Sequence, residues 1–263
     1  MARVIAIANQ KGGVGKTTTA INLAAALAAN DFRILLIDMD PQGNSTTGLG
    51  INKLDSQATV YDVLSGRTNL SEILVTVQPD GLLLAPSNRN LVAANVELVD
   101  TGRREFQLAN ALVQVRNEFD FVLIDCPPAL DLLTLNSLVA ADSVLIPIQC
   151  EFFALEGISQ LLDTIDRLRE NLQPSLVVEG ILLTMFDERT NLGRQVAADL
   201  RSFFEGDVFQ TIVPRSIRLA EAPSFGKTIL TYDPRSKGAE SYIQLAKEIV
   251  ANEQRRQQSQ SAR

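Results

Sequence analysis

The stretch NQKGGVGKTTT near the start of the chain combines glycine, lysine and threonine at a spacing suited to holding phosphate groups. The general phosphate-loop pattern is a glycine, four residues of any type, and then Gly-Lys-Ser/Thr. Gly15, Lys16 and Thr17 supply its second half. Gln10 stands where the first glycine is expected, and a second lysine, Lys11, follows it. The loop therefore carries one lysine more than the general pattern needs.

Each part of this loop has a chemical use. Its glycines let backbone N–H groups converge on phosphates at the N-terminus of the following helix, where the partial positive charge favours anions. We expect Lys16 to hold the β- and γ-phosphates and the Thr17 hydroxyl to ligate Mg²⁺. A glycine-rich turn that only caps a helix is the alternative, but lysine and threonine at this spacing favour phosphate binding.

Three aspartates stand at the ends of strand-like runs. Asp38 and Asp40 belong to LLIDMDPQGN, and Asp125 belongs to FVLIDCPP. Aspartate often serves only as a cap or turn residue at such a place. Ligands of open α/β sheets, however, bind at the carboxyl ends of parallel strands, so three carboxylates there indicate a function. Asp125, on a strand of the Walker B type, is expected to hold a metal ion through water.

Strand-like and helix-like patterns alternate along the chain, which favours an α/β fold: a mostly parallel sheet with helices on both faces. The expected strands cover residues 3–9, 33–40, 81–87, 119–128, 142–150, 176–186 and 208–214. The expected helices cover residues 17–30, 103–118, 130–141, 154–172, 192–204 and 238–251. Neither a linker nor an internal repeat divides the chain. We therefore expect one domain over residues 1–251 and a polar, disordered tail over residues 252–263.

Composition limits the classes of function. The chain has 263 residues, 46% of them hydrophobic, without an apolar run of the ~18 residues that a membrane span needs. The start, MARVIAIAN, lacks the features of a signal peptide, so we expect a cytoplasmic protein. The absence of histidine excludes histidine acid–base chemistry, and two cysteines make no disulfide framework. A net charge of −7 argues against nucleic-acid binding unless basic residues gather on one face.

The run KGGVGKTT resembles the deviant Walker A motif of the ParA/MinD family of P-loop ATPases. The resemblance implies ATP and Mg²⁺ as ligands, and a face-to-face homodimer in which Lys11 of one subunit reaches the phosphates bound by the other. Lys16 would serve its own site and Lys11 its neighbour's, like an arginine finger supplied in trans. A solvated loop lysine is the alternative for Lys11. The implied ATP contacts in the loop are Lys11, Gly12, Gly13, Val14, Gly15, Lys16, Thr17 and Thr18.

The same resemblance gives roles to the aspartates. In the family the second aspartate of the LLIDMD segment lies beside the attacking water and the Mg²⁺ shell, and this role falls on Asp40. Asp38 either supports Mg²⁺-bound water or orders the loop. The implied catalytic residues are Lys11, Lys16 and Asp40. The implied metal-site residues are Thr17, Asp38, Asp40 and Asp125.

Later segments narrow the resemblance to chromosomal ParA proteins of the Soj type. They cover residues 150–157, 182–193, 213–229 and 232–242. The resemblance implies adenine contacts near Pro214 and Ser216, and sequence-independent DNA binding by Arg189 and Arg218. Residues 185–237 contain eight Arg/Lys and seven Asp/Glu, so this region is roughly neutral. DNA binding would then be modest in a monomer and additive across a dimer.

The implied function is that of a ParA-type ATPase. ATP would close a sandwich homodimer, which binds DNA non-specifically and segregates or positions a chromosome, a plasmid or another cargo. A ParB-like or analogous adaptor protein would stimulate hydrolysis. The protein would be cytoplasmic and associated with the nucleoid, and no membrane would take part.

Other functions of this fold stay open as alternatives. A MinD-like membrane-cycling ATPase needs an apolar face in its C-terminal helix, which the tail EQRRQQSQSAR lacks. A ParA-type ATPase that positions a protein compartment is a second alternative. An iron protein would need Cys126 and Cys150 at a dimer face, but both adjoin buried strands and fit core cysteines. A non-enzymatic scaffold would show no turnover, and three scattered tyrosines disfavour a tyrosine kinase.

Overall fold

A central β-sheet organises the chain in this computed structural model, which describes residues 1–52, 58–151 and 154–261. Within these residues the sheet has eight strands in the order β3-β4-β2-β5-β1-β6-β7-β8. All neighbouring strands are parallel except β3 and β4, which are antiparallel. The α/β prediction is confirmed. The strands are β1 (Arg3–Ile7), β2 (Ile34–Asp38), β3 (Val75–Val77), β4 (Leu82–Ala85), β5 (Phe121–Asp125), β6 (Ser143–Gln149), β7 (Val177–Phe186) and β8 (Val208–Pro214).

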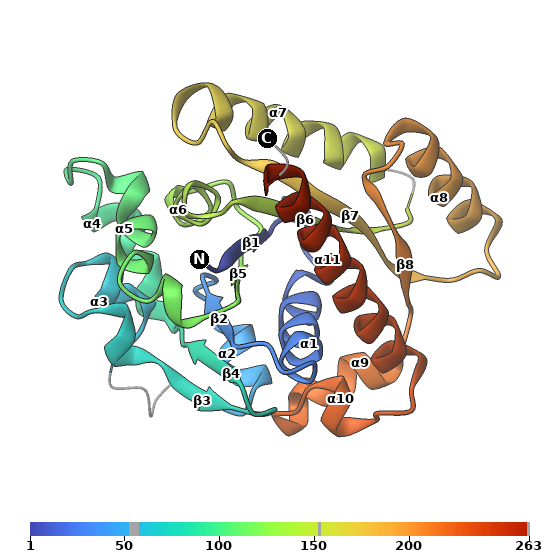
Figure 1. The fold of residues 1–263 in the computed structure, drawn as a ribbon, viewed down its shortest axis with the longest axis horizontal. Helices are drawn as coiled ribbons and strands as arrows, with labels where there is room; N and C mark the ends of the chain where they lie inside the picture. Colours follow the sequence, from blue (N-terminus) through green and yellow to red (C-terminus); the bar gives the residue numbers. More distant parts are fainter. Residues whose placement is uncertain (53–57, 152–153, 262–263) are drawn as a thin grey trace.

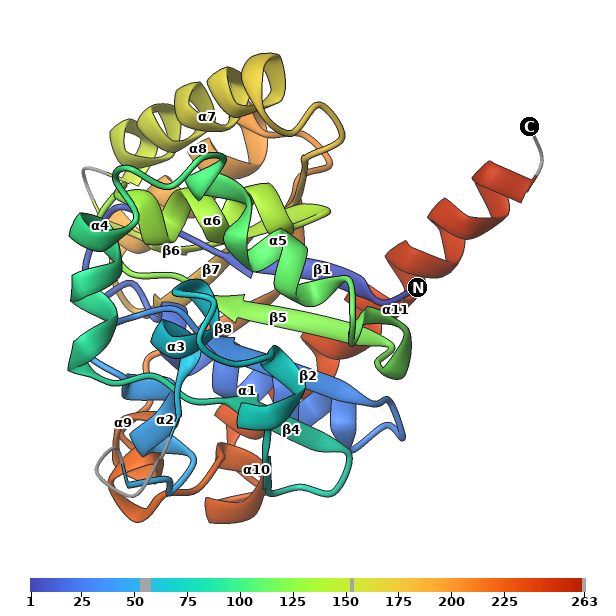
Figure 2. The same ribbon diagram turned by 90° about the vertical axis from the view of Figure 1, so that its left-hand side faces the viewer.

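Helices cover both faces of this sheet, as Figures 1 and 2 show. One face packs against α1 and α11, and the other against α3, α5, α6, α7 and α8. The α-helices are α1 (Lys16–Ala28), α2 (Asn44–Gly48), α3 (Val60–Leu64), α4 (Ala94–Glu97), α5 (Gln107–Leu112), α6 (Leu132–Ala140), α7 (Ala154–Asn171), α8 (Asn191–Phe203), α9 (Ile217–Glu221), α10 (Ile229–Tyr232) and α11 (Lys237–Ser261). Short 3₁₀ helices are η1 (Leu70–Ile73), η2 (Arg89–Ala93), η3 (Arg104–Phe106), η4 (Arg116–Glu118) and η5 (Ala222–Phe225). None of the described helices combines the length and apolar character of a bilayer span.

The central strands are apolar on both faces because both faces are covered. In β5, Val122 and Ile124 belong to one core cluster, whereas Phe121 and Leu123 belong to the other. Continuous burial of this kind is typical of parallel sheets flanked by helices. Carboxylates follow this apolar run at the carboxyl ends of β2 and β5. Asp38 and Asp125 are the last residues of β2 and β5 and lie opposite each other in the register.

The long helix expected over residues 103–118 is wrong. The structure has η3, the short α5 and η4 in this segment. The side chain of Asn136, on α6, explains the break. Its Oδ1 accepts the Leu108 N–H at 3.1 Å and its Nδ2 donates to the Arg104 carbonyl at 2.9 Å. In a continuous α-helix these two backbone groups would bond to each other, so Asn136 takes the place of a helical hydrogen bond.

The expectation of a disordered tail is wrong for residues 252–261, because α11 continues to Ser261. Residues 262–263 lie outside the described residues. Figure 2 shows the last turns of α11 extending beyond the body of the molecule. At their base, Arg256 donates to Glu179 on β7 at 2.6 Å. Arg3 on β1 donates to the same carboxylate at 3.0 Å. This buried charge cluster ties the end of the helix to the sheet, a tertiary contact that the polar composition of the tail does not reveal.

Candidate nucleotide-binding site

A cleft of about 440 Å³ opens at the carboxyl ends of the strands. The phosphate loop lies at this edge because it follows β1, whose last residue, Ile7, pairs with Asp125 of β5. Of the expected ATP contacts, all except Lys11 and Val14 line the cleft. The lining comprises Gly12, Gly13, Gly15, Lys16, Thr17, Thr18, Asp40, Gln42, Asn44, Pro128, Thr184, Met185, Val213, Pro214, Ser216, Leu219, Ala220 and Tyr242.

The loop reaches its shape through two glycines with positive φ. Gly13 has φ of 75° and Gly15, the N-cap of α1, has φ of 90°, a region that side-chain-bearing residues rarely adopt. Thr184, at the end of β7, donates its hydroxyl to the carbonyl of Val14 at 2.8 Å. This bond turns Val14 into the core, where it is buried. Val14 therefore anchors the loop from behind and does not line the cleft.

The ammonium group of Lys16 lies against the phosphate loop from which its side chain starts. The side chain is 7% exposed, and Nζ donates to the carbonyl of Lys11 at 3.1 Å. Burial lowers the pKa of Lys16, and the charges of Asp125 and Asp40 act in the opposite direction. Phosphate oxygens in the cleft would add further negative charge and hold the ammonium form. The geometry suits the expected role of Lys16.

Lys11 points to a different partner. Its Nζ lies 2.6 Å from Glu151 Oε2, just after β6, and both side chains are nearly half exposed. The Lys11 backbone is fixed, since its N–H donates to Asn9 Oδ1 at 2.9 Å and Asn9 Nδ2 donates to the Pro147 carbonyl at 2.8 Å. The Lys11 backbone is thus part of the phosphate loop, but its ammonium group lies outside the cleft of its own chain.

Asp38 is fully buried and its carboxylate is occupied by protein donors. Oδ2 accepts the Thr46 N–H at 2.8 Å and the Thr46 hydroxyl at 2.7 Å. Oδ1 accepts the Asp40 N–H at 3.2 Å. Burial raises the pKa of Asp38, and these donors oppose the rise. Of the two roles expected for Asp38, this arrangement favours ordering the loop.

Asp125 differs because one of its oxygens has no partner. Oδ2 accepts the Ser45 hydroxyl at 2.8 Å, whereas Oδ1 is buried and bonds to no residue that the structure describes. Burial, followed by the charge of Asp38, raises the pKa of Asp125, and the Ser45 and Thr17 hydroxyls oppose the rise. A buried acceptor without a donor fits a site for a metal-bound water. The residues present therefore suit Mg²⁺ beside Thr17.

Asp40 is the expected carboxylate that lines the cleft. Its Oδ1 accepts the Gln42 N–H at 2.8 Å, which turns the carboxylate along the loop after β2. No group of three or more acidic, cysteine or histidine side chains suited to a metal ion occurs in the described part of the chain. This agrees with Mg²⁺, which usually keeps several waters and takes substrate phosphates as ligands.

Several apolar residues also line the cleft, among them Pro128, Val213 and Leu219. Pro214 and Ser216 lie there as expected, but the Ser216 hydroxyl accepts the Leu219 N–H at 3.4 Å and so caps α9. Sequence reasoning missed several lining residues, among them Met185 and Tyr242. Met185 has a φ of 46°, and Tyr242, on α11, lies with its hydroxyl 3.3 Å from Thr19 Oγ1. Only the fold places α11 beside α1, so no local signal identified Tyr242.

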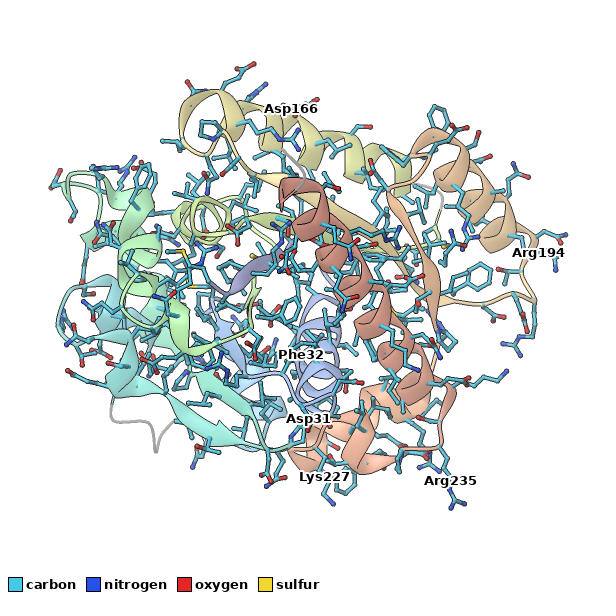
Figure 3. The ribbon with its side chains drawn as sticks, viewed as in Figure 1. Asp31, Phe32, Asp166, Arg194, Lys227 and Arg235 are labelled. Carbon is cyan, nitrogen blue, oxygen red and sulfur yellow. The ribbon has the colours of Figure 1, made fainter. Side chains whose placement is uncertain are left out.

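The two expected DNA contacts lie outside the cleft and are paired with carboxylates. Arg189 Nη2 lies 2.7 Å from Asp187 Oδ2. Arg218 lies 3.2 Å from Glu221 Oε2 and 3.7 Å from Asp233 Oδ2. Six exposed basic residues between 185 and 237 form no ion pair with any residue in the described ranges: Arg194, Arg201, Arg215, Lys227, Arg235 and Lys237. Figure 3 shows Lys227 and Arg235 at the edge of the molecule, with their side chains pointing outward.

The two cysteines fit core positions. Cys126 is buried beside the site, and burial raises the pKa of its thiol to about 12. Cys150 is half-buried, and burial raises the pKa of its thiol to about 11. Metal clusters bind thiolates, so neither environment favours the iron-protein alternative.

Comparisons with known proteins agree with this geometry. A family model described as an AAA domain matches residues 2–178. The sporulation initiation inhibitor protein Soj of Bacillus subtilis is 52% identical over 252 residues, which cover 96% of this chain and 100% of the relative. The chromosome partitioning protein ParA of Myxococcus xanthus is 54% identical over 248 residues, which cover 94% of this chain and 88% of the relative.

A solved structure adds a ligand-bound example of the fold. Cobyrinic acid a,c-diamide synthase from Mycobacterium smegmatis, with a bound ATP analogue and magnesium, superposes with a TM-score of 0.84 at 38% identity. The match covers 95% of this chain and 95% of that one. The expected ligands, ATP and Mg²⁺, are thus those of a close structural neighbour.

Proposed function

Because this chain belongs to the ParA/Soj family of chromosome-partitioning P-loop ATPases, we propose that ATP closes two copies of it into a dimer that binds DNA non-specifically. A partner protein then stimulates hydrolysis, and the dimer leaves the DNA. The chain is an ATPase that uses Mg²⁺. The observation that carries the proposal is the cleft, which the phosphate loop, Asp40, Pro214 and Ser216 line together.

Within one subunit, different residues bind the phosphates, hold Mg²⁺ and orient the attacking water. The loop N–H groups and Lys16 hold the phosphates, and Thr17 and Asp125 hold Mg²⁺, directly and through water. Mg²⁺ held by these residues would supply positive charge that offsets the charge of the phosphates. Asp40 lines the cleft with its carboxylate and orients the attacking water. Asp38 keeps this loop in place through Thr46 and the Asp40 N–H.

Lys11 gives the site its dependence on a second subunit. Its ammonium group pairs with Glu151 outside the cleft of its own chain, so the γ-phosphate lacks one cation in the monomer. In the dimer, Lys11 of each subunit contacts the phosphates in the other cleft and stabilises the charge that develops during transfer. Hydrolysis is thereby restricted to the assembled dimer.

The DNA binding that we propose uses exposed basic residues between positions 185 and 237. Arg218 and Arg189 are partly neutralised by their carboxylate partners, whereas Lys227 and Arg235 form no ion pair with any described residue. With a net charge of −7, one subunit would bind DNA weakly. Two subunits held together present twice the contacts, and the second set binds at a high effective concentration. In the cell this dimer associates with the nucleoid.

The test is a set of three proteins in one assay series. Wild type, Lys16→Ala and Asp40→Ala are compared for ATP binding, for dimerisation by size-exclusion chromatography with ATP, and for DNA retention. Lys16→Ala should fail to bind ATP. Asp40→Ala should bind ATP, accumulate as a dimer on DNA, and hydrolyse ~10²–10⁴ times more slowly, the range for loss of a general base.

Two outcomes would contradict the proposal. Wild-type protein that stays monomeric with ATP and retains no DNA would remove the dimer and the DNA role, while leaving the ATPase. Loss of ATP binding in Asp40→Ala would move this residue from hydrolysis to metal holding or folding.

A further inference from the structure

The loop after β2, which carries Asp40, is held from a neighbouring strand by Ser87. Ser87 follows β4 by two residues and is 1% exposed. Its hydroxyl lies 2.9 Å from the Asp40 carbonyl, and its N–H lies 2.9 Å from Thr46 Oγ1. Ser87 therefore contacts the loop at both of its ends, before and after the turn that leads into α2.

The direction of each hydrogen bond follows from the groups themselves. A carbonyl can only accept, so the Ser87 hydroxyl donates to Asp40 O. A backbone N–H can only donate, so Thr46 Oγ1 accepts from Ser87 and gives its own proton to Asp38 Oδ2 at 2.7 Å. The chain of donors ends on a buried carboxylate, a strong acceptor. The direction of every hydrogen bond in this network is therefore fixed.

We propose that Ser87 is a positioning residue for ATP hydrolysis, which acts by fixing the backbone of Asp40. This rests on the proposed role of Asp40 as the carboxylate that orients the attacking water. Ser87 does not line the cleft and contacts no predicted phosphate-binding residue. Its hydroxyl holds the peptide group that directly follows the Asp40 Cα, so its loss lets the carboxylate move. Small misplacements of a reacting group cost large factors in rate.

The experiment compares Ser87→Ala with Ser137→Ala. Ser87→Ala removes the hydroxyl and keeps the N–H bond to Thr46. Ser137 is a matched control, because it is also a fully buried serine whose hydroxyl donates to a backbone carbonyl, that of Leu133 at 2.8 Å. We expect Ser87→Ala to lower kcat by roughly tenfold, the effect of about one lost hydrogen bond. Its Kd for ATP should stay within about twofold of wild type, the pattern of an interaction used in the transition state.

A double variant separates positioning from general damage. If Ser87 acts through Asp40, then Asp40→Ala/Ser87→Ala should hydrolyse at the same residual single-turnover rate as Asp40→Ala, because the carboxylate to be positioned is gone. A merely structural role would lower the rate further in the double variant. Melting temperatures of Ser87→Ala and Ser137→Ala, measured alongside, exclude loss of folding.

Three results would overturn the inference. They are wild-type kcat in Ser87→Ala, an equal fall in ATP affinity and kcat, or additive losses in the double variant. Failure of the proposed function would give a different result from failure of the inference about Ser87. If Asp40→Ala itself hydrolyses ATP like wild type, the role of Asp40 is wrong, whatever Ser87 does.

Discussion

At the scale of single residues, the ion pair between Lys11 and Glu151 must break if Lys11 is to reach a second subunit in the proposed dimer. Both side chains are nearly half exposed, and an exposed pair contributes only ~0–1 kcal/mol. Negatively charged phosphates in a second subunit can therefore compete for Lys11. This weak ion pair keeps the Lys11 side chain outside the cleft of its own chain and leaves it free to move to another partner.

Glu151→Gln should release Lys11 and favour closure. We expect the ATP concentration for half-maximal dimerisation to fall by roughly two- to fivefold, which corresponds to the ~0.4–1 kcal/mol of an exposed pair. Glu205→Gln is the control, since it removes one exposed negative charge that has no ion-pair partner among the described residues. Sedimentation velocity across an ATP titration measures the shift. An unchanged or higher ATP requirement in Glu151→Gln would show that the pair does not restrain Lys11.

Gly12 allows a test that separates folding from closure. A Cβ built at Gly12 meets no described atom within 4 Å, and its φ is not in the left-handed region. Gly12→Val should therefore fold and bind ATP. It should fail to dimerise, because a branched side chain stands where the loops of two subunits approach. Size-exclusion chromatography with ATP, beside a nucleotide-binding assay, measures both properties, and a wild-type dimer would place Gly12 away from the subunit contact.

At the scale of elements, α11 is held by the charge cluster around Glu179. This carboxylate is buried, yet it receives Arg256, Arg3 and the Ser143 hydroxyl. Burial acts to raise the pKa of Glu179, but Arg256, Ser143 and Arg3 hold it below its usual value. The charged form is thus stabilised in the folded protein, and it joins β1, β6, β7 and the end of α11.

Arg256→Ala should lower the free energy of unfolding by about 1–3 kcal/mol at neutral pH, the range for a hydrogen bond to a charged group. Arg255→Ala is the control, because the exposed Arg255 side chain donates to the Ala251 carbonyl and forms no ion pair with any residue that the structure describes. Since the pKa of Glu179 is lowered on folding, its contribution is present above the ordinary carboxyl range and is lost as the pH falls through the folded value. The difference between wild type and Arg256→Ala should therefore shrink in acid. Urea unfolding at two pH values measures it, and equal stability of the two arginine variants at pH 7 would contradict it.

At the scale of the whole molecule, the proposed DNA binding would depend on how far acidic side chains offset the basic ones. Arg218 pairs with Glu221, which also accepts the Tyr232 hydroxyl at 3.1 Å. Arg218→Ala should weaken DNA binding by the ATP dimer and make it less dependent on salt, because phosphate contacts release counterions. Glu221→Gln should have the opposite effect, since it removes the nearer of the two carboxylates that pair with Arg218. Glu240→Gln is the matched control for charge alone, because this exposed glutamate forms no ion pair within the described ranges.

Gel-shift titrations at two salt concentrations, on two unrelated sequences, measure these effects. Both sequences should bind alike, because phosphate contacts position a protein without specifying a sequence. Unchanged DNA affinity in both Arg218→Ala and Glu221→Gln would move the DNA face to Arg215, Lys227 and Arg235.

The sequence by itself was enough to predict the features that are formed by residues close together in the chain. Local chemistry identifies the phosphate loop and the ends of β2 and β5, because each consists of a few consecutive residues. The α/β pattern was also predictable, because each strand and helix has its own local pattern of apolar residues. Tertiary structure decided the contacts between distant residues. Asp40 and Ser87 are 47 positions apart, and Lys11 and Glu151 are 140 apart. They meet only because the sheet places β4 beside β2 and β6 beside β1. The order of strands depends on how helices pack over both faces, which no single segment encodes.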